Sequence, residues 1–370
     1  MDLNIVTLNI PYPPDYGAMI GSFYRIKWLK AEGIRIHLHC FEYGRRPAEE
    51  LESLCEAVNY YSRNTTLLNQ FSKIPYIVKS RTSIDLLENL KTNDFPILFD
   101  GLHTTYFLNH PDLKTRKKLV RAHNIEHQYY KSLSNHELNP IKKLFYLIEY
   151  KKLKSYEKII GESNFSLTVS PGDHEYFSRK YQNSVYITPF HPFEEIVSLP
   201  GRGGYILYHG DLSVAENSII AESLIKNVFS KMPFNCIIAG KNPPPGIKTK
   251  ASVNNNIRII SNPDTNEMED LIRNAHINLL PSLTSNGFKM KLIFALFSGR
   301  HCLVNSVSAE NLPDKSLFQI ADTNEQLIDK INLLMNQEFT PEMINERKII
   351  VEDKFSNQTN ARKLIELAFS

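Results

Sequence analysis

Two doubly wound α/β domains are the fold that this sequence predicts, one in each half of the chain. The chain has 370 residues, more than twice the common domain size of roughly 100–150 residues. Short apolar runs alternate with helical stretches throughout, as in βαβ units. A segment rich in proline and glycine, residues 189–204, separates two series of such runs. We therefore expect one domain over residues 1–194 and a second over residues 195–354.

Ten apolar runs are expected to be parallel strands. The first domain has them at residues 5–8, 34–41, 97–99, 119–122 and 167–170. The second domain has them at residues 205–208, 236–239, 257–260, 277–280 and 302–305. These series predict two Rossmann-like domains that face each other across a cleft. The end of the chain, residues 355–370, has helical apolar spacing and is expected to form a helix that can pack back on the first domain.

Composition excludes several classes of protein. With 42% hydrophobic and 22% charged residues, the chain can bury a core and is not disordered. A net charge of +3 is too small for a dedicated nucleic-acid binder. No apolar run approaches the roughly 18–20 residues of a spanning helix, and the N-terminus enters a strand pattern without a basic signal region. The four cysteines form no CxxC pair, which favours a reducing compartment, so we expect a cytoplasmic protein.

Loops after the strands are the candidate ligand sites of such domains, because helix N-termini and backbone N–H groups are exposed there. In the first domain, Gly17 ends the loop after the first strand, before a helix expected to begin near Ile20 and to carry Arg25. A proline-rich turn that caps a helix explains the same residues. His103 follows a middle strand, and residues 121–126 follow the next. Their polar groups can bind hydroxyls, but such a histidine is as often structural.

In the second domain, glycines follow two strands and lysines begin a helix. Gly210 and Gly240 permit close backbone approach, and Lys241 adds a point charge suited to phosphate. Gly287 precedes Lys289 and Lys291, which lie in the expected first turn of an apolar helix over residues 292–297. Cations at that end oppose the helix dipole by roughly 0.3–1 kcal/mol each, so the pattern favours a bound anion such as a diphosphate. Lysines that simply point to solvent are the alternative.

A basic segment before Gly161 combines five lysines with apolar residues. Such a helix can rest on anionic headgroups and bring in a lipid-linked acceptor. A solvated helix face is the commoner explanation. The residues are Lys142, Lys143, Lys151, Lys152 and Lys154, interleaved with Leu144, Phe145, Leu147 and Ile148.

A different class of function is suggested by His123, Glu126 and His127, which match the H-x-x-E-H signature of zinc hydrolases. Zinc binding there requires a helix that places both histidines on one face. Residues 119–122 instead indicate a strand that ends just before His123. The zinc hydrolase is therefore the weaker hypothesis.

The chain resembles the family 4-like glycosyltransferases (glycosyltransferase group 1) of bacterial surface polysaccharide biosynthesis, which have the GT-B fold and use nucleotide-sugar donors. The resemblance runs almost end to end. It rests on residues 14–17 with Arg25, residues 121–126, residues 170–173, residues 209–213 with Asn217, and residues 287–299.

The resemblance implies roles for the candidate residues. Gly17 would approach the donor phosphates, and His103 would lie near the transferred sugar as the catalytic-site histidine. Lys289 and Lys291 would contact the diphosphate. The remaining donor-side candidates are Gly210, Gly240, Lys241, Asn286 and Gly287, and the acceptor-side candidates are Tyr16, Arg25, Arg121, His123 and Glu126.

The chain also departs from the family pattern. Many relatives have two glutamates eight positions apart, and the second commonly binds the nucleotide ribose; here the positions hold Asn286 and Phe294. Tyr16 replaces one glycine of the first loop. Because a phenyl ring cannot accept a hydrogen bond from a ribose hydroxyl, three alternatives follow. The donor is held differently, another residue substitutes, or ordinary donor binding has been lost.

The expected reaction is glycosyl transfer from a nucleotide-diphosphate sugar to a saccharide or lipid-linked saccharide, with retention of configuration as in the family. Lysines and backbone dipoles can stabilise the departing diphosphate. No D-x-D sequence occurs, so we expect no metal and no other cofactor. The alternatives are a non-catalytic sugar-nucleotide-binding partner, which Asn286 and Phe294 favour, and a sugar-nucleotide epimerase on the same fold.

Overall fold

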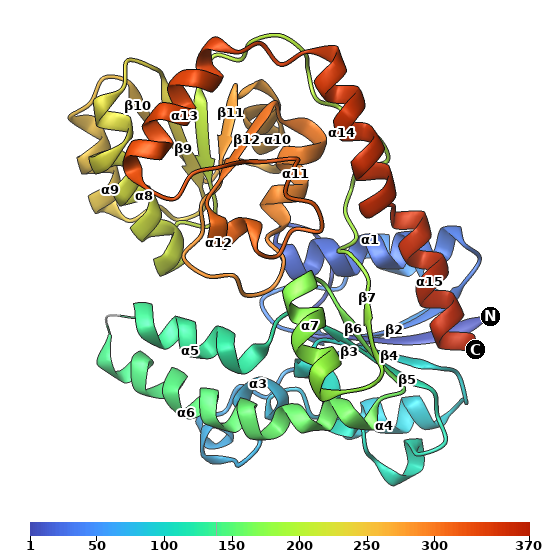
Figure 1. The fold of residues 1–370 in the computed structure, drawn as a ribbon. Coiled ribbons are helices and arrows are strands. Elements are labelled where there is room, and N and C mark those ends of the chain that lie inside the picture. Colours follow the sequence, from blue (N-terminus) through green and yellow to red (C-terminus); the bar gives the residue numbers. More distant parts are fainter. Residues whose placement is uncertain (138) are drawn as a thin grey trace. The chain divides into compact units, whose positions relative to one another are not determined.

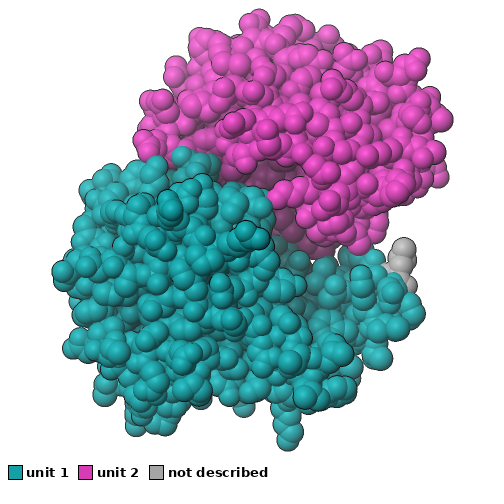
Figure 2. Space-filling view, turned by 180° about the vertical axis from the view of Figure 1, so that it is seen from behind, with its two compact units in different colours: residues 1–192, 286–288, 355–370 teal, residues 193–285, 289–354 magenta. Residues whose placement is uncertain are grey.

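The computed structural model describes residues 1–137 and 139–370. The chain divides into two compact units, coloured separately in Figure 2. Unit 1 comprises Met1–Pro192, Asn286–Phe288 and Phe355–Ser370, and unit 2 comprises Phe193–Ser285 and Lys289–Lys354. The first boundary between the units falls after Pro192, whereas the sequence predicts a boundary after residue 194.

Unit 1 is built on a seven-stranded parallel sheet with the strand order β3-β2-β1-β4-β5-β6-β7. From β1 the chain adds β2 and β3 on one side and then returns to add β4 on the other. The order therefore reverses between β1 and β4, which is where doubly wound sheets bind ligands. The strands are β1 (Asp2–Thr7), β2 (Arg35–Glu42), β3 (Ala57–Ser62), β4 (Ile97–Asp100), β5 (Lys118–Ala122), β6 (Phe165–Thr168) and β7 (Ser184–Tyr186).

Helices cover both faces of this sheet (Figure 1). Successive side chains of β1 alternate between two cores: Ile5 packs with α1 and α15, and Val6 packs with α4 and α6. Burial on both faces explains why the strands are continuous apolar runs. The helices are α1 (Gly17–Ala31), α2 (Glu49–Leu54), α3 (Tyr76–Lys79), α4 (Ile84–Lys91), α5 (Glu126–His136), α6 (Pro140–Tyr156), α7 (Pro171–Lys180) and α15 (Asn357–Phe369), with 3₁₀ turns η1 (Leu67–Phe71), η2 (Leu102–Phe107), η3 (Pro111–Leu113) and η4 (Glu157–Glu162).

The terminal helix α15 packs on unit 1. Ala361 and Leu364 are buried in the core that α1 shares. The Arg362 Nε donates a hydrogen bond to Glu32 at the end of α1 (2.9 Å), and Asn360 donates one to the Thr188 hydroxyl (2.7 Å).

Unit 2 repeats the architecture with a six-stranded parallel sheet in the order β10-β9-β8-β11-β12-β13. Its strand order reverses between β8 and β11. The strands are β8 (Ile206–His209), β9 (Cys236–Gly240), β10 (Ile257–Ser261), β11 (Ile277–Leu279), β12 (His301–Val304) and β13 (Gln319–Ile320). The helices are α8 (Ala215–Asn227), α9 (Pro245–Ser252), α10 (Thr265–Asn274), α11 (Met290–Ser298), α12 (Ser306–Ala309), α13 (Asn324–Asn336) and α14 (Pro341–Lys354), with the 3₁₀ turn η5 (Phe229–Lys231).

The structure confirms the predicted fold class, two doubly wound α/β halves, and each of the ten predicted strands overlaps an observed one. Three strands were not predicted: β3, β7 and β13. The helix expected near Ile20 begins at Gly17, so that glycine is the first helical residue and not part of a separate loop. In the described part of the chain, no helix is both long and apolar enough to span a bilayer.

Candidate functional site

Asp100 organises the end of the unit 1 sheet where the strand order reverses. It is the last residue of β4 and is fully buried. Its carboxylate pairs with Arg25 and accepts a hydrogen bond from the hydroxyl of Ser22, both on α1. Nε2 of His123 lies 2.9 Å from its other oxygen. Burial by itself raises the pKa of Asp100, but the charges of Arg25 and His123 outweigh it and hold that pKa below its usual range.

His103 and His123 border the same backbone position, Gly101. A side chain there would place its Cβ 3.1 Å from Cδ2 of His123 and 3.2 Å from Nδ1 of His103. Gly101 also has φ +99°, which L-residues rarely adopt. Burial, followed by the nearby Arg81, lowers the pKa of His103 well below its ordinary value. A neutral imidazole at pH 7 can both donate and accept hydrogen bonds, as hydroxyl recognition requires.

Arg25 and Arg121, two of the predicted acceptor-side residues, have partners inside unit 1. Their side chains are 1% and 2% exposed. Arg25 holds Asp100, and Arg121 donates a hydrogen bond to the carbonyl of Thr188 (3.1 Å). Both arginines therefore support the end of the sheet from within unit 1, and their acceptor-side role stays a prediction.

Arg81 and Glu126 are buried ionisable groups at this end of unit 1. The Arg81 Nε donates to the carbonyl of Leu8 (2.7 Å), in the loop after β1. Burial, followed by the charge of Arg63, lowers the pKa of Arg81 to about 9. Glu126 begins α5 and lies 3.5 Å from the Asn124 amide; burial raises its pKa to about 7. Neither the strand patterns nor the loop glycines of the sequence indicate Arg81.

The zinc hypothesis is wrong. Helix α5 begins at Glu126, so His123 precedes the helix and cannot share a helical face with His127. His123 instead contacts Asp100, and Nδ1 of His127 lies 2.9 Å from Glu157. Among the residues that the structure describes, no group of three or more histidine, cysteine, aspartate or glutamate side chains is arranged to hold a metal ion.

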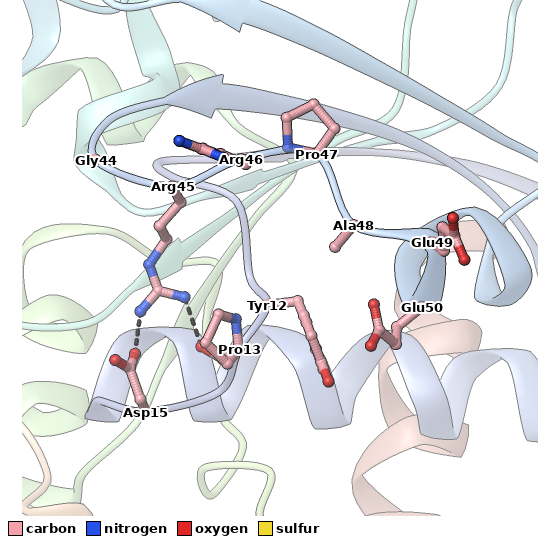
Figure 3. A pocket seen from close by; sticks show the side chains of 10 residues that line it. All are labelled: Tyr12, Pro13, Asp15, Gly44, Arg45, Arg46, Pro47, Ala48, Glu49 and Glu50. Atoms are coloured by element: carbon pink, nitrogen blue, oxygen red, sulfur yellow. Dashed lines mark hydrogen bonds and ion pairs between the residues drawn. The ribbon is translucent and has the colours of Figure 1, made fainter.

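A hollow of about 590 Å³ lies beside the loop after β1 (Figure 3). Arg45 contacts Asp15 and the carbonyl of Pro13 at one side, and Tyr12 and Glu50 lie at the other. The Arg45 guanidinium also lies 5.0 Å from the ring centre of Tyr16, an exposed side chain. None of its lining residues is among those around Asp100, so the hollow does not include that cluster.

In unit 2, Gly210 and Gly240 contact each other. A Cβ on Gly240 would lie 1.8 Å from the carbonyl oxygen of Gly210, so β8 and β9 can end side by side only because residue 240 is a glycine. The backbone N–H of Leu212 donates to the carbonyl of Lys241 (2.9 Å). The need for glycine at residue 240 is thus explained by strand packing within unit 2. The Lys241 side chain is exposed.

The lysines Lys289 and Lys291 lie at the start of α11, as predicted, with Lys289 as its N-cap residue. Lys291 is partly buried, and its ammonium lies 5.3 Å from the ring centre of Tyr208 on β8. Burial first, and then the charge of Lys289, lowers the pKa of Lys291 to about 8. Burial, followed by the charge of Lys291, lowers the pKa of His209 to about 3. The positive charges of Lys289 and Lys291 therefore lie near the place where the strand order reverses, between β8 and β11.

Glu216, in the first turn of α8, was not predicted and connects this helix to the loop after β11. Its carboxylate accepts hydrogen bonds from the hydroxyl of Ser282 (2.5 Å), the backbone N–H of Leu283 (2.9 Å) and the hydroxyl of Thr284 (3.2 Å). Its distance to the Lys289 ammonium is 4.0 Å. Burial raises the pKa of Glu216, but the charge of Lys289 and the hydrogen bonds from Ser282 and Leu283 lower it by a larger amount. The pKa of Glu216 is therefore below its ordinary value. Acidic residues are common in the first turn of a helix because they complement the helix dipole. The sequence therefore does not distinguish Glu216 as a residue that holds the loop after β11.

The two positions where relatives carry glutamates have different surroundings. Phe294 packs edge-on against Phe193 (ring centres 5.1 Å apart) and beside Met268 and Leu271, so it belongs to an apolar cluster of unit 2. Asn286 and Gly287 belong to unit 1. Gly287 has φ +62°, and a Cβ there would lie 2.1 Å from the Asn124 side-chain oxygen.

Residues 203–337 match the model of the family described as glycosyl transferases group 1. The whole chain superimposes on solved structures of GT-B proteins. TarM from S. aureus, solved as a mutant with fondaparinux, alpha-GlcNAc-glycerol and UDP, has a TM-score of 0.70 and 12% identity, with 100% of each chain covered. The chain has the GT-B fold, and part of its second unit matches the group 1 glycosyltransferase family.

Two further proteins are similar to this chain over most of its length. Anabaena HepE, solved with UDP and glucose, has a TM-score of 0.67 and 11% identity over 99% of this chain and 98% of that one. An uncharacterised 44.6 kDa protein in the cps region of Klebsiella pneumoniae is 24% identical over 345 residues, 88% of each chain.

Proposed function

We propose that this protein is a glycosyltransferase that moves a sugar from a nucleotide-diphosphate donor to a saccharide or lipid-linked saccharide in polysaccharide biosynthesis. The observation that carries the proposal is the lysine pair Lys289 and Lys291 at the N-terminus of α11. Relatives of the same fold were solved with UDP, and one relative is described by its place in a cps region. We propose retention of configuration, as the family resemblance implies, and a cytoplasmic location.

The lysine pair suits a diphosphate for electrostatic reasons. Two ammonium groups close enough to lower the pKa of Lys291 repel each other, and both oppose the positive end of the α11 dipole. The single carboxylate that contacts them among the described residues, Glu216, is occupied by three donors of the loop after β11. A bound diphosphate would relieve the repulsion and would also meet the free N–H groups of the helix.

We propose that the donor is held without a carboxylate at residue 294. Phe294 packs against Phe193 and belongs to the same apolar cluster as Met268 and Leu271, so this position serves the core of unit 2. The lysines, together with the N-terminus of α11, would then supply most of the affinity. The same groups would stabilise charge on the departing diphosphate, so that no metal is required.

In unit 1, we propose that His103 binds a sugar hydroxyl. Its ring is neutral at pH 7, and its Nδ1 has no hydrogen-bond partner among the described residues. His123 has its Nε2 directed at Asp100 and is thereby fixed in orientation. Asp100, Arg25 and Ser22 would act as positioning residues behind the two histidines.

The proposal is tested by thermal unfolding with a panel of nucleoside diphosphates and nucleotide sugars, with EDTA present. A ligand that binds only the native state must raise Tm, by an amount that grows with its concentration above Kd. We expect one base to be preferred and EDTA to have no effect. If no nucleotide shifts Tm, the proposed donor site is wrong.

Phe294 and Asn286 favour a second candidate, a non-catalytic protein that binds sugar nucleotides. The two candidates differ in turnover. The stabilising nucleotide sugar is incubated with the protein and mixed lipid-linked saccharides, and release of the nucleoside diphosphate is measured. Release supports the enzyme if His103→Ala abolishes it. Binding without release favours the partner protein.

A further inference from the structure

Seven large apolar side chains are exposed on two neighbouring elements of unit 1, which we call the α6–η1 surface. Monomeric proteins rarely expose contiguous apolar patches of more than a few hundred Å², and larger ones mark interaction sites. On η1 the exposed fractions are 73% for Leu67, 78% for Leu68 and 85% for Phe71. On α6 they are 79% for Ile141, 58% for Leu144, 39% for Leu147 and 45% for Ile148.

The contacts between α6 and η1 show that the two elements lie side by side. The Lys152 ammonium donates to the carbonyl of Gln70, the residue before Phe71 (2.5 Å). Lys152 follows Ile148 by four residues, so both lie on the same side of the helix. Glu149 accepts a hydrogen bond from the backbone N–H of Tyr76 (2.7 Å), which joins α6 to α3 just after η1. In Figure 1, α3 lies beside α6 in unit 1.

The outward side of α6 is also strongly basic. Lys143, Lys151 and Lys154 are exposed between the apolar residues, and Lys142 is exposed at the start of the helix. The one acidic residue of Pro140–Tyr156 is Glu149, which is fully buried. No carboxylate of α6 therefore balances the lysines at the surface.

We propose that the α6–η1 surface docks this protein onto an anionic lipid bilayer. Apolar side chains interleaved with lysines are what an interfacial helix needs to bury its apolar face at the headgroup boundary while the ammonium groups contact lipid phosphates. A second copy of the chain fits less well, because a two-fold contact would bring the same lysines together. The purpose, access to a lipid-linked acceptor, rests on the proposed function, but the docking itself does not.

The test is co-sedimentation of the full chain with phosphatidylcholine vesicles and with vesicles that contain phosphatidylglycerol. We expect binding to the anionic vesicles alone, reduced at least roughly tenfold by Lys143→Glu/Lys151→Glu. Leu68→Ser/Phe71→Ser should reduce it by a similar factor through lost apolar contact. Both variants change exposed side chains, so folding should be unaffected.

Matched controls use exposed residues of the same types in unit 2. Lys226→Glu/Lys248→Glu makes the same charge change, and Val253→Ser/Ile349→Ser removes side chains that are 80% and 72% exposed. These controls should bind as the wild type does. Equal loss in the controls, or no vesicle binding by the wild type, would overturn the proposal. So would a dimer in size-exclusion chromatography that the α6–η1 variants dissociate.

Nucleotide stabilisation measured on the same variants separates this inference from the proposed function. Vesicle binding without any nucleotide shift leaves the docking surface intact and contradicts the donor site. A nucleotide shift without vesicle binding contradicts the docking surface alone.

Discussion

Residue 287 must be a glycine for two reasons, its backbone conformation and the space around it. Its φ of +62° disfavours side chains, and a Cβ would lie 2.1 Å from the Asn124 oxygen and 2.8 Å from the His123 carbonyl oxygen. We expect Gly287→Ala to lower the free energy of unfolding by about 1–3 kcal/mol, because either the backbone or the Asn124 side chain must move. Urea denaturation measures the change.

Gly21 is the matched control for that substitution. It lies within α1, and a Cβ there would meet nothing within 4 Å. Gly21→Ala should therefore raise the free energy of unfolding by about 0.5–1 kcal/mol through helix propensity. Similar effects of the two substitutions would show that the Asn124 contact does not constrain residue 287.

Lys291 should make nucleotide affinity dependent on pH. Its pKa of about 8 means that the ammonium loses its proton just above neutral pH, while a bound diphosphate favours the protonated form. Affinity for UDP should therefore be steady near pH 7 and should fall by up to about tenfold per pH unit above 8. Isothermal titration checks this.

Lys291→Arg is the control, because a guanidinium remains protonated throughout this range. The variant should lose the decline above the Lys291 pKa even if its overall affinity differs. If the wild type and Lys291→Arg have the same pH profile, the Lys291 ammonium does not contact the nucleotide.

Only part of the residue-level picture is accessible from the sequence. Two lysines in a helix's first turn are visible because they oppose the dipole. Asp100 ends an apolar strand, and Arg81 lies between short elements, so no periodicity distinguishes either. Arg25 and Arg121 have partners inside unit 1, Asp100 and Thr188, that lie far from them in sequence, so no local pattern indicates these contacts.

At the scale of elements, Glu216 fixes the loop after β11 to α8. We expect Glu216→Gln to lower the free energy of unfolding by about 1–2 kcal/mol, since a neutral amide accepts fewer and weaker hydrogen bonds. Hydrogen exchange of residues 282–285 should become faster. Because the folded-state pKa of Glu216 is lowered, its contribution is present above its unfolded pKa and is lost as pH falls through the folded value.

Glu222→Gln on the same helix is the control. Its carboxylate pairs with Lys250 at an exposed site, and such pairs contribute about 0–1 kcal/mol. If Glu216→Gln changes neither stability nor exchange more than Glu222→Gln does, the loop is held by other contacts.

Elements with a continuous apolar run could be predicted, and those without one could not. The ten predicted strands are mostly buried on both faces. The missed strands β3, β7 and β13 lie at the edges of their sheets. They carry partly exposed or polar residues, such as Asn59 in β3, and β13 has two residues, so neither composition nor length marks them as strands.

At the scale of the whole molecule, each unit reverses its strand order once, between β1 and β4 and between β8 and β11. The candidate residues gather at these two points: Asp100 and His103 in unit 1, and Lys289 and Lys291 in unit 2. The alternation of strands and helices was enough to predict both sheets. The replacement of a glutamate by Phe294 could be read from the sequence, but its physical reason, packing on Phe193, required the fold.

The most direct test of the central claim is titration of UDP, or of whichever nucleoside diphosphate stabilises the protein, into Lys289→Ala/Lys291→Ala with EDTA present. Lys226→Ala/Lys248→Ala, with two exposed lysines of unit 2 removed, is the control. The account predicts at least about a tenfold rise in Kd for the first variant, an unchanged Kd for the control, and an unchanged Tm without ligand within a few degrees. Equal Kd values for the first variant and the wild type would contradict the claim that this lysine pair holds the donor diphosphate.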